Sequence, residues 1–134
     1  MYLLDTNILS ELIKKKPNDN LIARLKSVPS ASLFTTSVCV MELRFGALKR
    51  GPTSDLWSKI QGRILSRVRC LDFGYKDAMV AAEVLHELHS IGQPIGIEDI
   101  MIGAVALSNQ LTVVSANTKH LSRIPNLKVE NWLL

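Results

Sequence analysis

Acidic side chains in apolar surroundings are the residues of this chain best suited to chemistry. They are Asp5, Glu42 and Asp99, and each ends, interrupts or opens a hydrophobic stretch (residues 1–5, 38–43 and 99–107). Two carboxylates about 4 Å apart repel each other by about 4 kcal/mol at an effective dielectric near 20. If the three acids converge in the fold, they therefore require a cation.

The type of ligand atom indicates which cation. Carboxylate oxygens without neighbouring histidine or cysteine ligands favour Mg²⁺ or Mn²⁺ over zinc. Such an ion lowers the pKa of a water and neutralises charge during hydrolysis of a phosphodiester, and in-line attack by that water leaves a 5′-phosphate and a 3′-hydroxyl. We expect Asp5 and Asp99 to be direct metal ligands, and Glu42 to bind metal or to orient the attacking water.

Each acid also has a structural interpretation. Asp5, followed by Thr6, could cap a helix N-terminus, and Asp99 could be placed to suit a helix dipole. Glu42 is harder to explain in this way, because neither Ser nor Thr lies three residues before it to form a capping box. A partly buried acid without a local partner needs a metal, a ligand or a distant base.

The elements that must position these acids alternate between short strands and longer helices. Strand-like runs lie at 2–4, 33–36, 70–73, 112–115 and 127–129, and helical patterns at 7–15, 19–27, 37–48, 54–66, 75–89 and 97–109. This alternation predicts an α/β fold, a three-layer α/β/α sandwich with a short parallel sheet and the first strand at its centre. Ligands bind outside the carboxyl ends of such strands, where all three acids could face one crevice.

Bulk properties are consistent with one small globular domain over residues 1–134. Hydrophobic residues make up 47% of the chain and charged residues 21%. The net charge of +4 is compatible with a polyanionic partner without requiring one. We expect Cys39 and Cys70 to be buried, reduced thiols. No leader pattern opens the chain and no apolar run is long enough to span a bilayer, so we expect a cytoplasmic protein with no membrane partner.

Several segments together resemble a known family. They are Tyr2–Asn7, Thr36–Gly46, Pro94–Ala104 and Ile124–Leu133. Through these segments the chain is similar, over essentially its whole length, to PIN-domain proteins, specifically the VapC-type ribonuclease toxins of bacterial toxin–antitoxin pairs. The family's acids fall on Asp5, Glu42 and Asp99. Many PIN domains have a fourth acid where this chain has Asn117, which contributes no charge and leaves one or two metals open.

The resemblance implies a Mg²⁺- or Mn²⁺-dependent endoribonuclease that cuts structured RNA, such as tRNA, and arrests translation. It also implies a cognate VapB-like antitoxin whose C-terminal segment lies across the catalytic groove. A toxin homodimer, and a higher assembly with the antitoxin, are implied as well. In this interpretation Asn117 and Thr6 support the acids, Asn117 by holding the attacking water or a second ion.

Basic residues and two rival functions complete the expectations. Lys14, Lys15 and Lys16 are candidate RNA-phosphate contacts, although cations also suit the end of a helix. Aromatic residues make up only 5% of the chain, which argues against base-stacking platforms of the single-strand-binding kind.

The main rival function is a non-catalytic PIN-like module that binds RNA or protein, with the acids acting only as caps. A phosphotransfer receiver domain is disfavoured, because the opening offers one acid rather than an adjacent pair.

Overall fold

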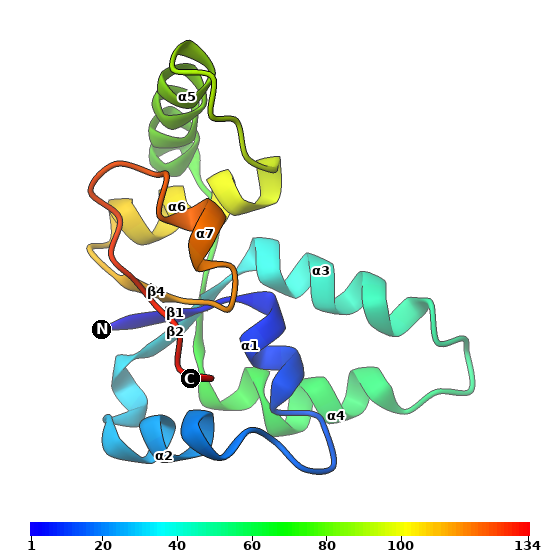
Figure 1. The fold of residues 1–134 in the computed structure, drawn as a ribbon. Helices are drawn as coiled ribbons and strands as arrows, with labels where there is room; N and C mark the ends of the chain where they lie inside the picture. Colours follow the sequence, from blue (N-terminus) through cyan, green and yellow to red (C-terminus); the bar gives the residue numbers. More distant parts are fainter.

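A parallel sheet of five strands forms the centre of the computed structural model, which describes all residues 1–134 (Figure 1). Its order is β3-β2-β1-β4-β5, so that the first strand is central, as predicted. Every neighbouring pair is parallel. The strands are β1 (Tyr2–Leu4), β2 (Leu33–Thr36), β3 (Arg69–Leu71), β4 (Thr112–Val114) and β5 (Val129–Glu130).

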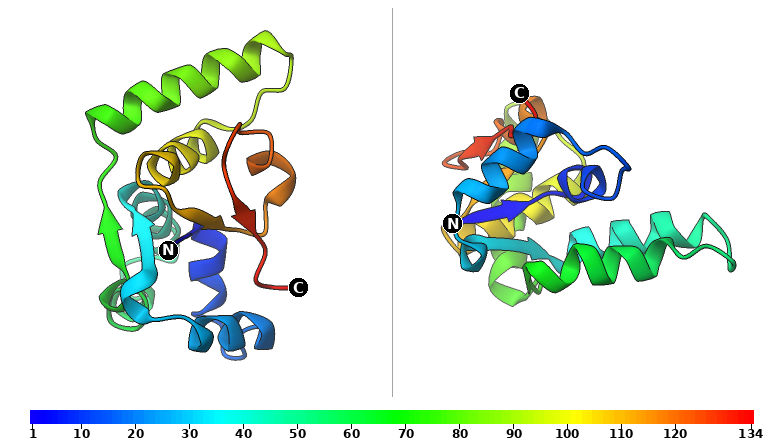
Figure 2. Two further views of the ribbon diagram at one scale, coloured as in Figure 1. Left: turned by 90° about the vertical axis from the view of Figure 1, so that its left-hand side faces the viewer. Right: turned by 90° about the horizontal axis from the view of Figure 1, so that it is seen from below.

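Helices supply the crossover connections that parallel strands require. They are α1 (Thr6–Glu11), α2 (Asp19–Ser27), α3 (Ser37–Leu48), α4 (Leu56–Arg63), α5 (Tyr75–Ser90), α6 (Ile97–Ser108) and α7 (Thr118–Leu121), with 3₁₀ turns η1 (Ser30–Ser32) and η2 (Leu65–Arg67). Helices α1 and α2 lie on one face of the sheet, and α5 and α6 on the other (Figure 2). The predicted three-layer α/β/α architecture is confirmed. None of the helices combines the length and apolar character needed to cross a membrane.

Two predicted helices are shorter in the structure than the pattern suggested. The helix expected at 7–15 ends at Glu11. Beyond it, each backbone N–H donates to the carbonyl three residues earlier, as in a 3₁₀ turn, rather than four residues earlier. The helix expected at 54–66 ends at Arg63. There Ile64 leaves helical geometry (φ −119°, ψ −64°) and turns its side chain into the core, where it is 2% exposed.

Helix α6 is the central packing element on its side of the sheet. It buries residues on several sides, among them Ile100, Ile102 and Val105, as the apolar run predicted. Gly103 allows a close approach to the chain after α7, because a Cβ there would lie 2.5 Å from Ile124 Cδ1. The N-terminal turn of this helix carries Asp99, so its tight packing also determines the position of that acid.

The C-terminal segment closes the sheet around Trp132, which is 1% exposed. Its ring lies edge-on to Tyr2, with centroids 4.8 Å apart, and Arg24 of α2 lies 4.9 Å from the ring centroid. Glu130 of β5 accepts hydrogen bonds from Trp132 Nε1 at 2.9 Å and Arg24 Nη2 at 2.8 Å. The end of the chain therefore connects α2 to β1 and β5.

The cysteines differ from each other in exposure. Cys39 lies on the buried face of α3, as predicted, whereas Cys70 is exposed. The expectation of a buried thiol is wrong for Cys70, because it lies on β3 at the edge of the sheet, where no further strand covers it.

Candidate active site

Asp5 lies directly after the central strand, at the carboxyl edge of the sheet, and is 4% exposed. Its Oδ1 accepts a hydrogen bond from the Thr6 backbone N–H at 2.6 Å, which makes Asp5 the N-cap of α1. Its Oδ2 accepts a second bond from Ser115 Oγ at 2.6 Å. The capping interpretation is therefore correct for one oxygen, while the other joins a larger network.

Glu42 lies on α3 and is half-buried. Its Oε1 accepts a hydrogen bond of 2.6 Å from Thr6 Oγ1, a residue 36 positions away in the sequence. The distant partner that its apolar surroundings required is thus a hydroxyl group rather than a base. Thr6 links Glu42 to Asp5 through its side chain and its own backbone.

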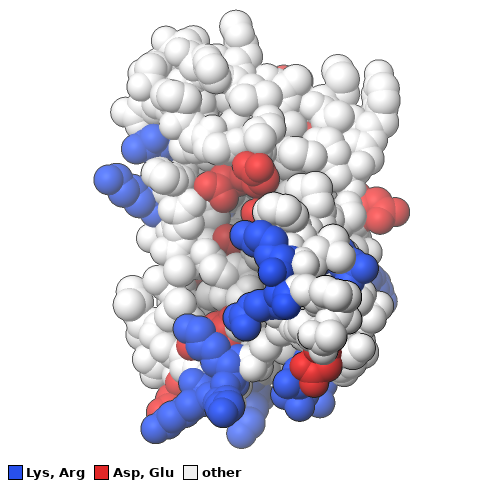
Figure 3. All heavy atoms as spheres, turned by 90° about the vertical axis from the view of Figure 1, so that its right-hand side faces the viewer, with Lys and Arg blue, Asp and Glu red and all other residues white.

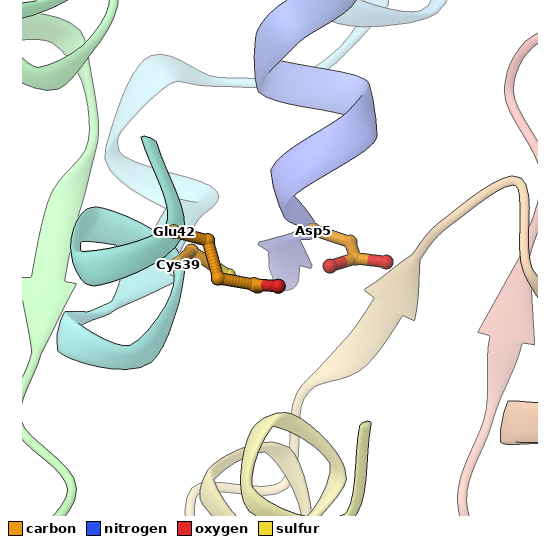
Figure 4. Close-up of side chains that lie close together, drawn as sticks. All are labelled: Asp5, Cys39 and Glu42. Carbon is orange, nitrogen blue, oxygen red and sulfur yellow. The ribbon is translucent and has the colours of Figure 1, made fainter. Parts of the chain in front are cut away.

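Asp5 and Glu42 come together at the start of α1, with Cys39 beside them (Figure 4). One carboxylate oxygen from each acid and Cys39 Sγ all lie within 4.8 Å of one another. Burial raises the pKa of the Cys39 thiol to about 12, so the thiol is protonated at neutral pH and is a poor ligand for a hard cation. Cys39 was not predicted at the site, although its position one turn before Glu42 on α3 could have indicated it.

Asp99 occupies the first turn of α6 and is linked to Asp5 through two residues that follow β4. Asn117 Nδ2 donates to Asp99 Oδ2 at 2.8 Å, and Asn117 N donates to Ser115 Oγ at 2.9 Å. Ser115 in turn donates to Asp5. We call this continuous hydrogen-bonded series the acid network: Glu42, Thr6, Asp5, Ser115, Asn117 and Asp99.

Ser115 is the member of the acid network that sequence reasoning missed. It is fully buried and follows β4 directly, just as Asp5 follows β1. The two strands are paired with Leu4 opposite Val114, so the residues after them meet at the same edge. Its position at the end of a strand was the feature of the sequence that could have identified Ser115 as a site residue.

The electrostatics of the acid network disfavour unneutralised charge. Burial is the largest cause that raises the pKa of Asp5, against the opposing effects of its bonds to Ser115 and Thr6. The pKa of Asp99 is also raised, first by burial and then by the Asp5 carboxylate, with smaller contributions from Glu42 and Glu98, whereas His120 lowers it. The Asp99 carboxylate is therefore repelled by the carboxylates of Asp5 and Glu42.

A small hard cation fits these residues. Asp5 and Glu42 offer oxygens within 4.8 Å of each other, and Asp99, which is outside that tight group, is coupled to both by charge. Carboxylate oxygens with room for water and phosphate are the usual environment of Mg²⁺ or Mn²⁺. Positive charge at this position would offset the burial that raises the pKa values of Asp5 and Asp99, and the repulsion that adds to it at Asp99.

A groove continues from the acid network along α3. It is lined by Thr6, Met41, Glu42, Phe45, Gly46, Lys49 and Glu98. The groove connects the start of α1 with α3 and the first turn of α6. Figure 3 shows that carboxylates gather near the middle of the side toward which α3 and α4 extend, with Lys and Arg side chains below them. A polyanion could therefore bind basic groups while it reaches the acids.

The lysines predicted to contact RNA phosphate lie farther along the chain. Lys14, Lys15 and Lys16 are exposed in the turn after α1, at the end of this helix away from Asp5. Lys14 Nζ forms an ion pair of 2.6 Å with Glu11, whereas the other two lysines have no ion pair. Their contact with RNA stays a prediction.

Comparison with known proteins gives consistent results. The PIN domain family model matches residues 2–127. The chain is 33% identical to "Ribonuclease VapC2" of Rickettsia felis over 98% of both chains, and 31% identical to "tRNA(fMet)-specific endonuclease VapC" of Salmonella typhimurium over 98% of this chain and 97% of the relative. The crystal structure of VapBC2 from Rickettsia felis bound to a DNA fragment from their promoter is also similar. It aligns with a TM-score of 0.85 and 30% identity, covering 98% of each chain.

Proposed function

Because this chain belongs to the PIN domain family, among its VapC-type ribonucleases, we propose that it is a toxin endoribonuclease that cuts structured RNA at the acid network. The observation that carries this proposal is the hydrogen-bonded series from Glu42 through Asp5 to Asp99 at the carboxyl edge of the sheet. A fold selected only for packing would not need three buried or half-buried acids, one of which, Asp99, is repelled by the other two. The relative that acts on tRNA(fMet) makes tRNA the first substrate to test.

The residues of the acid network have different roles in this proposal. Asp5 and Asp99 would hold Mg²⁺ or Mn²⁺. Glu42 would hold the ion or orient the attacking water with Oε2, since Thr6 already occupies Oε1. Thr6, Ser115 and Asn117 keep the three carboxylates in place through hydrogen bonds of 2.6 to 2.9 Å. These partners limit the rotation of the acids, and preorganisation of that kind lowers the barrier to reaction.

The metal, when bound, would supply charge neutralisation for the phosphate and a lower pKa for a water molecule. The chain's own residues determine where hydrolysis occurs. In the role of orienting the water, Glu42 would direct it toward phosphorus, so that the bond from phosphorus to the water oxygen forms as the bond to the 3′-oxygen breaks, and the departing 3′-oxygen takes up a proton. The products are a 5′-phosphate and a 3′-hydroxyl.

The proposal extends to partners and assembly. A VapB-like antitoxin would inhibit the site, as suggested by the similar chain in the VapBC2 complex. We also propose that the toxin forms a homodimer and assembles further with the antitoxin. Residues 1–134 would act as one domain, since a continuous core of buried residues extends from Leu3 to Trp132.

Cleavage of tRNA by the purified protein tests the proposal. We expect cleavage with Mg²⁺ or Mn²⁺ and none with EDTA, and the new ends should carry a 5′-phosphate and a 3′-hydroxyl. Asp99→Asn should lower the rate by at least about 100-fold, because it removes one charge from the cation site.

Asp72→Asn is the matched control, since Asp72 is an exposed aspartate just after β3, outside the acid network. This variant should cleave as the parent does. Cleavage that persists in EDTA and in Asp99→Asn would contradict the proposal. A protein that binds tRNA without ever cutting it would support the rival, a non-catalytic PIN module.

A further inference from the structure

Helix α3 presents an exposed apolar stripe beside the acid network. Met41, Phe45 and Leu48 are 55%, 62% and 57% exposed. Met41 and Phe45 line the groove that also contains Thr6 and Glu42, whereas Leu48 does not. The exposed side chains of Met41 and Phe45 therefore place an apolar surface inside the groove, beside the acids, and such a surface is typical of a binding site.

A lysine accompanies the aromatic ring in this groove. Lys49 Nζ lies 4.8 Å from the centroid of the Phe45 ring. The ion pairs of the molecule join Lys14 to Glu11, Arg24 to Glu130 and Lys59 to Asp55, so the ammonium group of Lys49 is left for an anion. Because Glu42, Phe45 and Lys49 are spaced by three and four residues, they lie in a row along one side of α3.

The row begins at Glu42 of the acid network and presents a different type of side chain at each position. It passes from a carboxylate to an exposed aromatic ring, and a cation lies over one face of that ring, within one groove. Gly46 leaves the groove open, because a Cβ at that position would meet nothing within 4 Å. A nucleotide has the complementary features, which are a flat base for the ring and a phosphate for the lysine.

We propose that this groove binds an unpaired nucleotide of the RNA next to the cleaved phosphodiester, with its base stacked on Phe45 and a phosphate bound by Lys49. The inference rests on the proposed ribonuclease function and specifies its substrate class. A base within a duplex is covered on both faces by its neighbours and cannot stack on Phe45, so the site selects RNA that is single-stranded at the cut. One ring is enough for one base, which is consistent with the low aromatic content of the chain.

Binding of oligoadenylate, free or annealed to oligouridylate, tests this inference in the full chain carrying Asp99→Asn to prevent cleavage. Phe45→Ala should weaken binding of the free strand by about 5- to 150-fold and leave binding of the duplex unchanged. Phe45→Trp should retain the affinity. Lys49→Gln should reduce the slope of log affinity against log salt by about 0.7, the value for one phosphate of a single strand.

Leu48→Ala is the matched control, since this residue is as exposed as Phe45 on the same helix but lies outside the groove. It should bind both RNAs as the parent does. In the protein that keeps Asp99, a cleavage assay should show that Phe45→Ala lowers kcat/KM for tRNA.

Other outcomes would overturn the inference. If the parent cleaves tRNA but Phe45→Ala binds and cleaves like it, the nucleotide site is wrong and the proposed function remains. Equal losses for free strand and duplex would exclude stacking. A change of oligomeric state in sedimentation, or loss of antitoxin binding alone, would assign the stripe to a protein interface. A parent that neither binds nor cleaves RNA would remove the proposed function and this inference together.

Discussion

Individual residues of the acid network combine a structural role with a proposed chemical one. Asp5 caps α1 with one oxygen and accepts from Ser115 with the other. The structural interpretation of this acid is therefore correct for one oxygen, and its role as a metal ligand stays a prediction. The Asn117 side chain donates a hydrogen bond to Asp99 without carrying a charge. A carboxylate at position 117 would add to the repulsion that Asp99 already meets.

Asp99→Asn should separate stability from activity. Removing the charge relieves repulsion from Asp5 and Glu42, so we expect the melting temperature without metal to stay equal or rise while cleavage is lost. Differential scanning fluorimetry in EDTA measures the first effect, and a tRNA cleavage assay the second. A large fall in the melting temperature would mean that Asp99 has a mainly structural role.

Asn117→Asp should make the protein more dependent on metal. The substitution replaces the amide that donates to Asp99 at 2.8 Å with a second carboxylate. We expect a lower melting temperature in EDTA than that of the parent, because two like charges then face each other. Titration with Mg²⁺ should raise the melting temperature more than in the parent. Asn126→Asp, at an exposed position far along the chain, is the control.

The raised pKa values of Asp5 and Asp99 predict how stability changes with pH in the absence of metal. Each ionises less readily in the folded state than in the unfolded state, where an aspartate has a pKa of about 4. Their destabilising contribution is full above the raised folded pKa, and it disappears as the pH falls through that value toward about 4. Urea unfolding in EDTA should therefore show a smaller change with pH for Asp99→Asn than for the parent. An identical pH profile for the two proteins would contradict the raised pKa of Asp99.

At the scale of elements, the packing of α6 determines where Asp99 lies. The absence of a side chain at Gly103 lets Ile124 contact the helix closely. This contact places the first turn of α6 near the residues that follow β4, where Asn117 meets Asp99.

Gly103→Ala tests this contact. Its Cβ would lie 2.5 Å from Ile124 Cδ1, and Ile124 is 2% exposed and cannot move freely. We expect a loss of about 1 kcal/mol in the free energy of unfolding, since overpacking exceeds the gain in helix propensity. Ile124→Val removes the Cδ1 atom, so the same glycine substitution should be tolerated in that background. Additive effects in this double-mutant cycle would show that the two residues are not coupled.

At the scale of the whole molecule, the C-terminal segment holds distant elements together. Trp132 contacts Tyr2 of the central strand and Arg24 of α2, and shares Glu130 with that arginine. Asn18, the N-cap of α2, donates to the Leu133 carbonyl at 3.1 Å. The last residues therefore close the layer that contains α2.

Trp132→Ala should cost about 3 to 5 kcal/mol in the free energy of unfolding, because it removes a large buried ring. Urea denaturation followed by circular dichroism measures this loss. Trp132→Phe retains an aromatic ring but loses the bond from Nε1 to Glu130, so its cost should be markedly smaller. If both substitutions cost less than about 1 kcal/mol, the segment does not close the fold as described.

The sequence alone predicted the α/β architecture and identified the three acids as candidate site residues. Hydrophobic patterning is local, so it predicted the strands at 2–4 and 33–36 and the helices at 19–27 and 37–48 with their observed bounds. The family resemblance in the segments around Asp5, Glu42 and Asp99 is likewise a property of short stretches, and the family match over residues 2–127 agrees with it.

Only the tertiary structure decided how those acids are connected. Thr6 and Glu42 are 36 residues apart and Asp5 and Ser115 are 110 apart, so no local pattern could pair them. Cys39 and Ser115 joined the site because strands and helices brought their ends together. Hydrogen bonds and charge coupling depend on distances of a few ångströms, and those distances exist only after the sheet has assembled.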